Sequence, residues 1–307
     1  MYREDLKDMK YVIGVDGGGT KTEAVAYTKD GKQISSGYSG CGNIVVNEEQ
    51  GLKNIEISIL QCLENLNVNN CIHIYAGIAG AEAGSNKEII ENYLKSRFPT
   101  SITVLNDADL AFNAVLKGED GILTISGTGS ISFGVLNNKH ARAGGWGNIL
   151  GDEGSGYNIA LQALKKIVSE KDDGLESSDL SKEILKTINA ATIFDMVKFV
   201  YNSNKADIAA IVPIIVKTAQ NNDEYAINIL KEASKDLVNI TVKVYKLLGF
   251  LSKVKIAIKG SILTKIPMMK EFYIRYLSDE ISDFEIIDEY GSPAKGGYYL
   301  ACKKSEF

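Results

Sequence analysis

The sequence predicts an α/β protein with a mostly parallel, helix-covered sheet in each of two related lobes. Short apolar runs rich in β-branched residues alternate with segments of helical spacing over the first half of the chain, which is typical of parallel strands joined by helices. A second observation is internal repetition. A strand, a glycine-rich polar turn and another strand begin at Tyr11 and again at Gly121. The repeat favours duplication of one lobe.

Length and composition narrow the class of protein. A chain of 307 residues is long enough for two domains and for a large core without disulfide or metal staples. Its formal net charge of −5 comes with no basic patch or arm, so nucleic-acid binding is excluded. The four cysteines form no CxxC pair, which predicts reduced thiols and no zinc site. The charged N-terminus and the lack of a long apolar run predict no signal peptide and no membrane span, so we expect a cytoplasmic protein.

Local spacing predicts the elements of the first lobe. Apolar residues recur at helical spacing at Leu52, Ile55 and Ile59, whereas Asp30-Gly31 forms a turn between two strands. The expected strands and helices are Tyr11–Val15, Glu23–Tyr27, Gln33–Tyr38, Ile72–Ile78 and Ile102–Leu105 as strands, and Glu48–Leu66 and Lys87–Phe98 as helices.

The second lobe repeats the strand pattern and adds helices. Its expected strands are Gly121–Ser126, Ile131–Val135, Lys255–Ile258 and Phe284–Ile287. A helix is expected from Tyr157 to Val168, followed by a loose polar segment, Glu170–Ser181, and then by mainly helical spacing up to Gly249. We therefore expect lobes at 1–117 and 118–307, a helical insertion near 157–249, and a last helix, 293–307, that is a candidate to return to the first lobe.

The turn Asp16–Thr22 has the composition of a phosphate loop. Consecutive glycines remove every Cβ, so backbone N–H groups can converge on an anion. Thr20, Lys21 and Thr22 add two hydroxyls and a cation, and Asp16 is placed to hold a hydrated Mg²⁺. A single turn of this kind is also typical of an ordinary hairpin. The matched second turn favours phosphate binding.

Neither common nucleotide motif fits these turns. A Walker loop needs a glycine directly before the lysine and a helix afterwards, but Thr20 precedes Lys21 and a strand follows. A dinucleotide fingerprint opens a helix, whereas the glycines of the second turn, Gly127 and Gly129, lead into an alternating strand. The two hairpins therefore predict a phosphate site of another class.

Carboxylates beside predicted helix starts have two interpretations. Asn106 or Asp107 could cap the helix that follows the strand ending at Leu105. A carboxylate of Asp107 or Asp109 could instead act as a base at the carboxyl end of the sheet, where open α/β sheets bind ligands. Position in the sequence does not choose between these two roles.

The glycine-dense loop from 144 to 156 is a candidate binding loop. Its tryptophan, Trp146, lies between two glycines, a poor setting for ordinary core packing. Asp152 and Glu153 precede a helix, so they are also candidates for helix caps. His73 lies in an apolar strand and is expected to be structural, and no GxSxG motif supports nucleophilic hydrolysis.

Taken in order, four motifs resemble a known family. Asp16 to Thr22, Asn106-Asp107, Ile125 to Ser130 and the loop from Gly144 to Ser155 are similar to the N-acetylglucosamine kinase-like members of the BadF/BadG/BcrA/BcrD branch of the sugar kinase, Hsp70 and actin superfamily. The resemblance implies two RNase H-like lobes of the actin-like ATPase type with an interlobe cleft. It also implies ATP and Mg²⁺ as cofactors, an amino sugar as substrate and a homodimer.

The resemblance assigns roles residue by residue. Gly260 and Ser261 match part of the family's adenosine site. Most members have two glycines there, whereas this chain has Lys259 before Gly260. Asp107 matches the catalytic base, and Asp16 to Thr22 match the first phosphate loop. The implied nucleotide contacts are Gly18, Gly19, Thr20, Lys21, Thr22, Gly127, Thr128, Gly129, Gly260 and Ser261. The implied sugar contacts are Asn43, Asp107, Ser130, Gly145, Trp146, Gly147 and Asp152.

The implied reaction is phosphorylation of a sugar hydroxyl. Two glycine turns and Mg²⁺ would hold ATP while Asp107 accepts a proton from the 6-hydroxyl of the sugar. N-Acetylglucosamine is the expected substrate. N-Acetylmuramic acid, glucosamine and glucose remain open.

Two other functions are compatible with this fold. An ATPase that activates a radical dehydratase or reductase would need cysteines grouped around an iron–sulfur cluster, but Cys62 falls on a predicted helix and Cys71 at the start of a strand. A sugar-responsive regulator would add a helix-turn-helix, and we expect the ten residues before the first strand to be too few for one. The kinase interpretation is therefore favoured.

Overall fold

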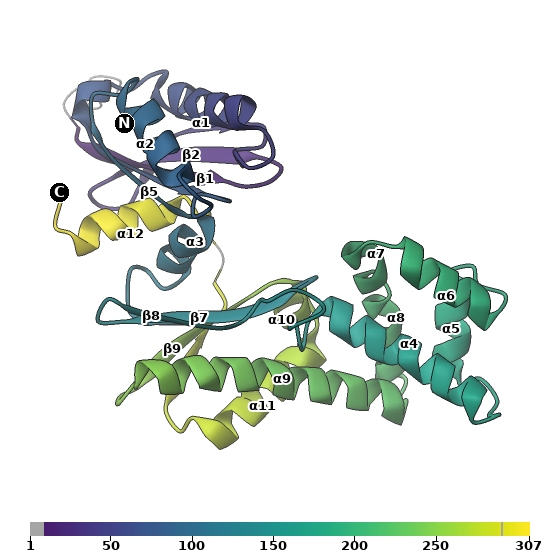
Figure 1. The fold of residues 1–307 in the computed structure, drawn as a ribbon. Helices are drawn as coiled ribbons and strands as arrows, with labels where there is room; N and C mark the ends of the chain where they lie inside the picture. The colour runs from purple at the N-terminus through teal and green to yellow at the C-terminus, as the bar shows by residue number, and fades with distance from the viewer. Residues whose placement is uncertain (1–8, 290) are drawn as a thin grey trace. The chain divides into compact units, whose positions relative to one another are not determined.

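The computed structural model describes residues 9–289 and 291–307, which divide into two compact units. Unit 1 runs up to Glu119 and also includes Glu289–Phe307, and unit 2 is Asp120–Asp288 (Figure 1). The charged segment before residue 9 lies outside the described residues. Of the helices in these ranges, none is long and apolar enough to cross a membrane.

Unit 1 is built on a mixed sheet, with five strands in the described ranges, in the order β3-β2-β1-β4-β5. The pairs β1–β2 and β2–β3 are antiparallel, whereas β4 and β5 run parallel to β1. The strands are β1 (Tyr11–Gly17), β2 (Thr22–Thr28), β3 (Gln33–Ser39), β4 (Cys71–Ile78) and β5 (Ser101–Asn106). The helices are α1 (Glu48–Leu63), α2 (Asn86–Lys95), α3 (Asp107–Val115) and α12 (Lys295–Lys303), with a 3-10 turn, η1 (Val68–Asn70).

Alternation along β1 explains how both faces of this sheet are covered. Ile13 and Val15 are buried in one cluster with the apolar residues of α1 and α2, whereas Val12 belongs to a second cluster that includes Ala301 of α12. The start of α12 approaches β1 closely, since a Cβ on Gly14 would lie 1.7 Å from the carbonyl oxygen of Ala294. Glycine in the middle of β1 is therefore required by packing.

The sheet of unit 2 repeats the connectivity of the first, and its five described strands have the order β10-β9-β6-β7-β8. Antiparallel β6–β7 and β7–β8 pairs are flanked by β9 and β10, which are parallel to β6 and to β9 respectively. The strands are β6 (Gly121–Ser126), β7 (Ser130–Leu136), β8 (Lys139–Gly144), β9 (Val254–Lys259) and β10 (Phe284–Ile287). The α/β prediction and the two-lobe duplication are confirmed.

Helices fill the long connection between β8 and β9. They are α4 (Gly156–Asp172), α5 (Asp179–Thr187), α6 (Ile193–Asn202), α7 (Lys205–Ala209), α8 (Val212–Gln220) and α9 (Glu224–Leu248), and α10 (Ser261–Lys265) and α11 (Pro267–Glu280) follow β9. We call α4–α9 the helical insertion. Figure 1 shows α9 running along the sheet of unit 2, with α11 beside it.

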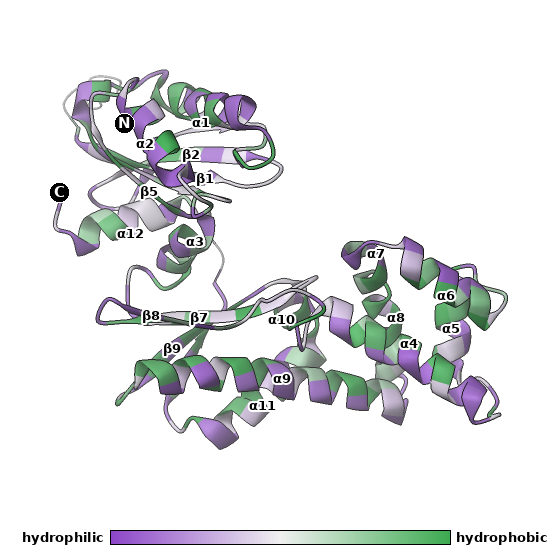
Figure 2. Cartoon of the chain, viewed as in Figure 1, coloured by the Kyte–Doolittle hydropathy of each residue, from purple (hydrophilic) through white to green (hydrophobic). Residues whose placement is uncertain are grey.

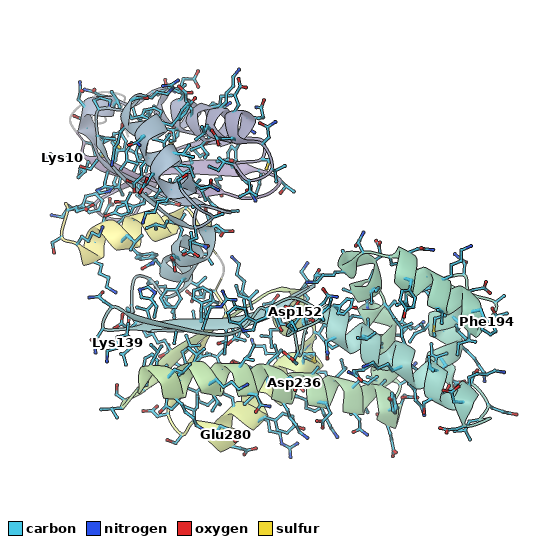
Figure 3. The ribbon with its side chains drawn as sticks, in the orientation of Figure 1. Lys10, Lys139, Asp152, Phe194, Asp236 and Glu280 are labelled. Atoms are coloured by element: carbon cyan, nitrogen blue, oxygen red, sulfur yellow. The ribbon has the colours of Figure 1, made fainter. Side chains whose placement is uncertain are left out.

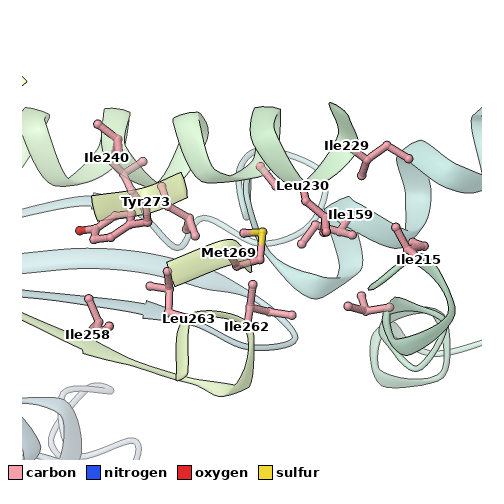
Figure 4. Close-up of a cluster of buried hydrophobic side chains, with 14 of the residues drawn as sticks. Ile159, Ile215, Ile229, Leu230, Ile240, Ile258, Ile262, Leu263, Met269 and Tyr273 are labelled. Atoms are coloured by element: carbon pink, nitrogen blue, oxygen red, sulfur yellow. The ribbon is translucent and has the colours of Figure 1, made fainter. Parts of the chain in front are cut away.

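The core of unit 2 joins the sheet to this insertion. Ile258 of β9, Leu230 of α9 and Tyr273 of α11 belong to the same buried cluster, together with Ile159 of α4 and Ile215 of α8 (Figure 4). In Figure 2 apolar and polar residues recur along α9 at helical spacing, as expected for a helix with one buried side. The insertion is therefore part of the folded core of unit 2.

Two sequence predictions for unit 2 were wrong in detail. The strand β8 was not anticipated because Lys139–Gly144 is a mostly polar edge strand with no apolar alternation. The segment Glu170–Ser181 was expected to be loose, but α4 continues to Asp172 and α5 begins at Asp179. The reason is the buried Glu170 carboxylate, which accepts hydrogen bonds from Ser178 N at 3.2 Å and Ser181 Oγ at 2.7 Å and so ties the two helices together.

Candidate functional site

The β1–β2 turn of unit 1 exposes its glycine and its cation. Gly18 N donates to Lys21 O at 3.0 Å, which closes the turn, while Gly19, Thr20 and Lys21 are exposed. Thr22 is fully buried, and its hydroxyl donates to Gly40 O at 2.8 Å. The exposed part of the turn is thus available to an anion, whereas Thr22 holds the neighbouring loop.

That neighbouring loop carries Asn43 to the same edge of the sheet. Gly42 N donates to Gly18 O at 3.0 Å, so the loop is hydrogen bonded to the turn. The Oδ1 of Asn43 accepts from Val45 N at 2.9 Å. The same oxygen lies 2.9 Å from the position that a Cβ on Gly80, just beyond β4, would take. Asn43 therefore lies at the carboxyl end of β4, where ligands bind in open sheets.

Asp107 follows the next parallel strand. The register pairs Gly17 of β1 with Ile78 of β4, and Ile78 with Asn106 of β5, so these three strands end at one level. Asn106 is the cap of α3, since its Oδ1 accepts from Ala108 N at 2.8 Å. Asp107 is therefore not the N-cap of α3. It is partly exposed and lies in the first turn of the helix. Unit 1 thus gathers the glycine turn, Asn43 and Asp107 at one sheet edge.

The β6–β7 turn of unit 2 is hydrogen bonded to the start of α4. Gly127 N donates to Gly129 O at 2.9 Å, and the carbonyls of Gly127 and Thr128 accept from Gly156 N at 2.7 Å and Tyr157 N at 3.3 Å. Ser130 is buried, and its hydroxyl donates to Glu153 O at 2.6 Å. In this geometry Ser130 holds the loop, while Thr128 is the exposed residue of the turn.

Asp152 is a buried carboxylate behind this turn. It is only 4% exposed and has a left-handed backbone, with φ of 61°. Its Oδ1 accepts from Ser130 N at 3.3 Å, and its Oδ2 forms an ion pair of 2.8 Å with Lys205 Nζ. Figure 3 labels Asp152 near the start of α4. Sequence reasoning missed Lys205, because it lies 53 positions away on a helix that no motif marks.

The glycine loop after β8 presents an aromatic side chain to solvent. Trp146 is 63% exposed, and the guanidinium of Arg142 lies over its ring at 4.3 Å from the centroid. Gly145 and Gly147 both have positive φ, of 70° and 90°, which a side chain would disfavour. Trp146 is therefore no part of the core, and the loop can offer both an aromatic face and unobstructed backbone.

A cavity of about 480 Å³ opens beside the second turn and lies wholly within unit 2. Its size is in the range of small-molecule sites. Predicted residues Gly127, Thr128 and Ser261 line it, and Gly260 next to them has a φ of 87°. The remaining walls are Ala206, Ala209, Ala210, Val212, Pro213, Val216, Lys217, Gln220, Ile262, Lys265 and Ile266. Sequence reasoning missed the walls from α7 and α8, since helical spacing does not reveal which helices surround a cavity.

The cysteines are not grouped as a cluster ligand set would be. Cys62 and Cys71 are buried in the core of unit 1, on α1 and β4 as predicted, and burial raises the pKa of each thiol to about 12. Within residues 9–289 and 291–307, no group of three or more His, Cys, Asp or Glu side chains is arranged to hold a metal ion. His73 is structural as predicted, with Nε2 at 2.9 Å from Thr103 Oγ1 and Nδ1 at 3.2 Å from Glu306.

A duplicated sheet with a glycine turn in the first hairpin of each copy, and a cavity of small-molecule size beside the turn of the second copy, defines an actin-like ATPase fold. The model of the BadF/BadG/BcrA/BcrD ATPase family matches residues 13–296. The chain belongs to this family, which implies that it uses ATP.

Curated relatives resemble the chain over nearly its whole length. An N-acetylmuramic acid/N-acetylglucosamine kinase of Clostridium acetobutylicum is 32% identical over 301 residues, covering 95% of this chain and 98% of the relative. An N-acetyl-D-glucosamine kinase of Dictyostelium discoideum is 26% identical, covering 96% and 98%. A structural-genomics target of Chromobacterium violaceum assigned as an N-acetylglucosamine kinase has a TM-score of 0.70 at 20% identity, covering 95% and 99%. This last likeness shows the fold.

Proposed function

We propose that the protein is an ATP-dependent amino-sugar kinase that phosphorylates the 6-hydroxyl of N-acetylglucosamine, with N-acetylmuramic acid and glucosamine as further substrates. The observation that carries this proposal is the 32% identity to the Clostridium acetobutylicum kinase over nearly the full length of both chains. The gathering of Asp107, Asn43 and the first glycine turn at one sheet edge of unit 1 agrees with a phosphotransfer site. The proposal includes a cytoplasmic homodimer, whose assembly light scattering would test.

ATP is assigned to both glycine turns and to the cavity of unit 2. Gly18, Gly19, Thr20 and Lys21 are the proposed contacts in unit 1, where exposed backbone and an ammonium suit phosphate oxygens. The apolar wall formed by the alanines of α7 and its C-terminal flank suits a flat nucleobase. Ser261, at the start of α10, lines the same cavity.

Mg²⁺ is assigned to Asp16. The donor set fits this ion, because Mg²⁺ is commonly held by one or two carboxylates together with water and substrate phosphates. Asp16 is partly exposed at the end of β1, directly before the glycine turn. When bound, the ion would neutralise charge on the phosphates.

The sugar is assigned to Asn43, Gly145, Trp146, Gly147 and Asp152, and Asp107 is the proposed base. The carboxylate of Asp107 would accept the proton of the 6-hydroxyl as its oxygen bonds to the γ-phosphorus and the bond from that phosphorus to ADP breaks. Asp107 is suited to this role because the neighbouring Asn106 satisfies the helix end. Ser130 is assigned to the sugar by family resemblance, although its hydroxyl is used by Glu153 O.

The test is ADP release measured with ATP, Mg²⁺ and a panel of free sugars, with a no-sugar control and identification of the phosphosugar. N-Acetylated hexosamines should stimulate ADP release strongly. Asp107→Asn should lower kcat by at least about a hundredfold while nucleotide binding persists, and Asp109→Asn on the same helix is the matched control. ATP hydrolysis that ignores sugar and yields no phosphosugar would overturn the proposal in favour of an activator-type ATPase.

A further inference from the structure

Lys205 makes a contact that the reaction described above does not use. Its ammonium pairs with Asp152, whose side chain is 6% exposed and whose second oxygen accepts from Ser130 N. Lys205 itself is 41% exposed. A buried carboxylate that loses its cation is left with an uncompensated charge, which is strongly unfavourable. The ion pair therefore holds the Asp152 carboxylate in its observed position.

The same lysine begins the helix that walls the cavity. Lys205 is the first residue of α7, and the next positions on that wall are Ala206, Ala209 and Ala210. The side chain of Asn204 caps α7 locally by accepting from Ala206 N and Asp207 N. That cap stabilises the first turn of α7 but does not connect α7 to the sheet. The ion pair does connect α7 to the sheet, because Asp152 also accepts a hydrogen bond from Ser130 of β7.

A close approach at Gly156 shows that these parts share little free space. A Cβ on Gly156 would lie 3.1 Å from Gly127 O, 3.3 Å from Ile262 and 3.4 Å from the Cβ of Ala209. The glycine turn, α10 and α7 thus meet at the start of α4. A shift of α7 would change both the cavity wall and the support of the turn.

We propose that Lys205 is a positioning residue that serves both substrates, holding the Asp152 carboxylate for the sugar and α7 for the nucleoside. This inference rests on the proposed function, in which Asp152 contacts the sugar and the cavity holds the nucleoside. Lys205 acts through the residues that touch the ligands and touches neither ligand itself. Its loss should weaken binding of both substrates and leave the chemical step nearly intact.

The first experiment is steady-state kinetics of Lys205→Met with both substrates varied. The KM for N-acetylglucosamine and the KM for ATP should each rise about tenfold, and kcat should change less than about threefold. Lys205→Arg keeps a cation and should restore both KM values to within about threefold of the wild type. The control is Lys182→Met, which breaks the exposed pair with Asp179 in the same insertion and should change neither KM.

A second experiment asks whether Lys205 acts through Asp152. In an Asp152→Asn background, Lys205→Met should add no further rise in the KM for the sugar, because the interaction is already lost. A further rise of about tenfold, or unchanged KM values for Lys205→Met alone, would overturn the proposal. If the Met variant fails to fold, Lys205→Gln, which keeps a hydrogen-bond donor, takes its place in both experiments.

A binding measurement separates this proposal from the proposed function. ADP alone is titrated into the wild type and into Lys205→Met without any sugar, and the variant should bind about tenfold more weakly. Equal ADP affinities would overturn the role of Lys205 in the nucleoside site even if the protein proves to be a sugar kinase. A wild type that binds ADP but transfers no phosphate to any sugar would overturn the proposed function and, with it, the sugar half of this inference.

Discussion

The two units use the same sheet for different purposes. In each unit, three antiparallel strands form two consecutive hairpins, and two parallel strands follow. The strand order is β3-β2-β1-β4-β5 in unit 1 and the matching β8-β7-β6-β9-β10 in unit 2. The connection into the fourth strand differs: unit 1 uses α1, whereas unit 2 uses the helical insertion α4–α9. The insertion supplies most of the apolar wall of the cavity and the partner of Asp152. In both units the shared sheet positions a glycine turn. The helices that lead into the fourth strand determine which residues surround that turn.

The two turns are also anchored differently. In unit 1 the turn is bonded to a loop, through Gly42 N and Gly18 O. In unit 2 the turn is bonded to a helix start, through Gly156 N and Gly127 O. We expect the helix-anchored turn to have less freedom to move, because the helix behind it belongs to the core of unit 2. The same kind of turn is therefore bonded to a loop in one unit and to the start of a core helix in the other, and we expect the second setting to be the more rigid.

Two glycines that follow matching parallel strands test this difference most strongly. Gly80 follows β4 and Gly260 follows β9, with φ of 81° and 87°. A Cβ on Gly260 would lie 2.2 Å from the carbonyl oxygen of Ser126, whereas a Cβ on Gly80 would meet the side chains of Val45 and Asn43, which can shift. Gly260→Ala should destabilise the protein by about 4 kcal/mol or more and Gly80→Ala by about 1–2 kcal/mol. Chemical denaturation of both variants measures the two values, and equal losses would contradict a more rigid frame in unit 2.

One glycine in each turn, Gly19 and Gly127, offers a second test, which separates folding from binding. No atom lies within 4 Å of a Cβ built on Gly19 or on Gly127, and neither glycine has a positive φ. Alanine at either position should therefore leave the melting temperature within about 2 °C of the wild type. If the turns bind phosphates, the added methyl should raise the KM for ATP about tenfold. An unchanged KM in one variant would remove that turn from the nucleotide site.

The repeated hairpins were predictable because their signal is local. A β-branched run, a cluster of glycines and an alternating run adjoin one another in the sequence, so the first two strands of each unit followed from pattern alone. Asp107 and Asp109 became candidate bases in the same way, as carboxylates directly after a strand, and the family resemblance selected Asp107. What the sequence left open was its competition with Asn106 for the helix end, which depends on side-chain geometry.

The parts that escaped prediction depend on contacts between distant segments. Lys205 pairs with Asp152 across 53 positions, and nothing in the residues around either one indicates the other. The strand β8 lies at a sheet edge, where exposure removes the apolar alternation that marks buried strands. The polar segment around Glu170 is a similar case. It forms the end of α4 and the start of α5 because the buried Glu170 carboxylate accepts hydrogen bonds from Ser178 and Ser181.

A half-buried carboxylate in unit 2, Asp236, gives a smaller, pH-dependent difference. Burial first, then repulsion from Glu153 and Glu232, raises the pKa of Asp236 on α9 to about 6 from 3.8 (Figure 3). Because the folded state binds this proton more tightly, its contribution to stability is full below pH 3.8 and is lost as pH rises through about 6. Asp236→Asn should therefore stabilise the protein by about 1 kcal/mol at pH 7.5, since solvent screens part of the penalty, and should give no gain near pH 4.

The measurement for Asp236 is chemical denaturation at both pH values. Asp279→Asn, on the exposed side of α11, is the matched control and should have no effect at either pH. Stabilisation of equal size at pH 4 and pH 7.5 would show that charge at Asp236 is not its cause.

A histidine in unit 1 has the opposite pH dependence and the smallest expected effect. Burial lowers the pKa of His73 below its ordinary value of 6.5; Glu306 opposes this shift and Lys304 adds to it. With its folded pKa depressed, His73 contributes stability above pH 6.5 that is lost as pH falls through the folded pKa. Glu306→Gln removes the opposing carboxylate, so the pKa of His73 should fall further and the loss in acid should deepen by a few tenths of a kcal/mol. Titration of the His73 ring by NMR in both proteins tests this. A wild-type pKa above 6.5 would show that desolvation does not dominate at this site, and a pKa that rises in Glu306→Gln would show that Glu306 does not oppose the shift.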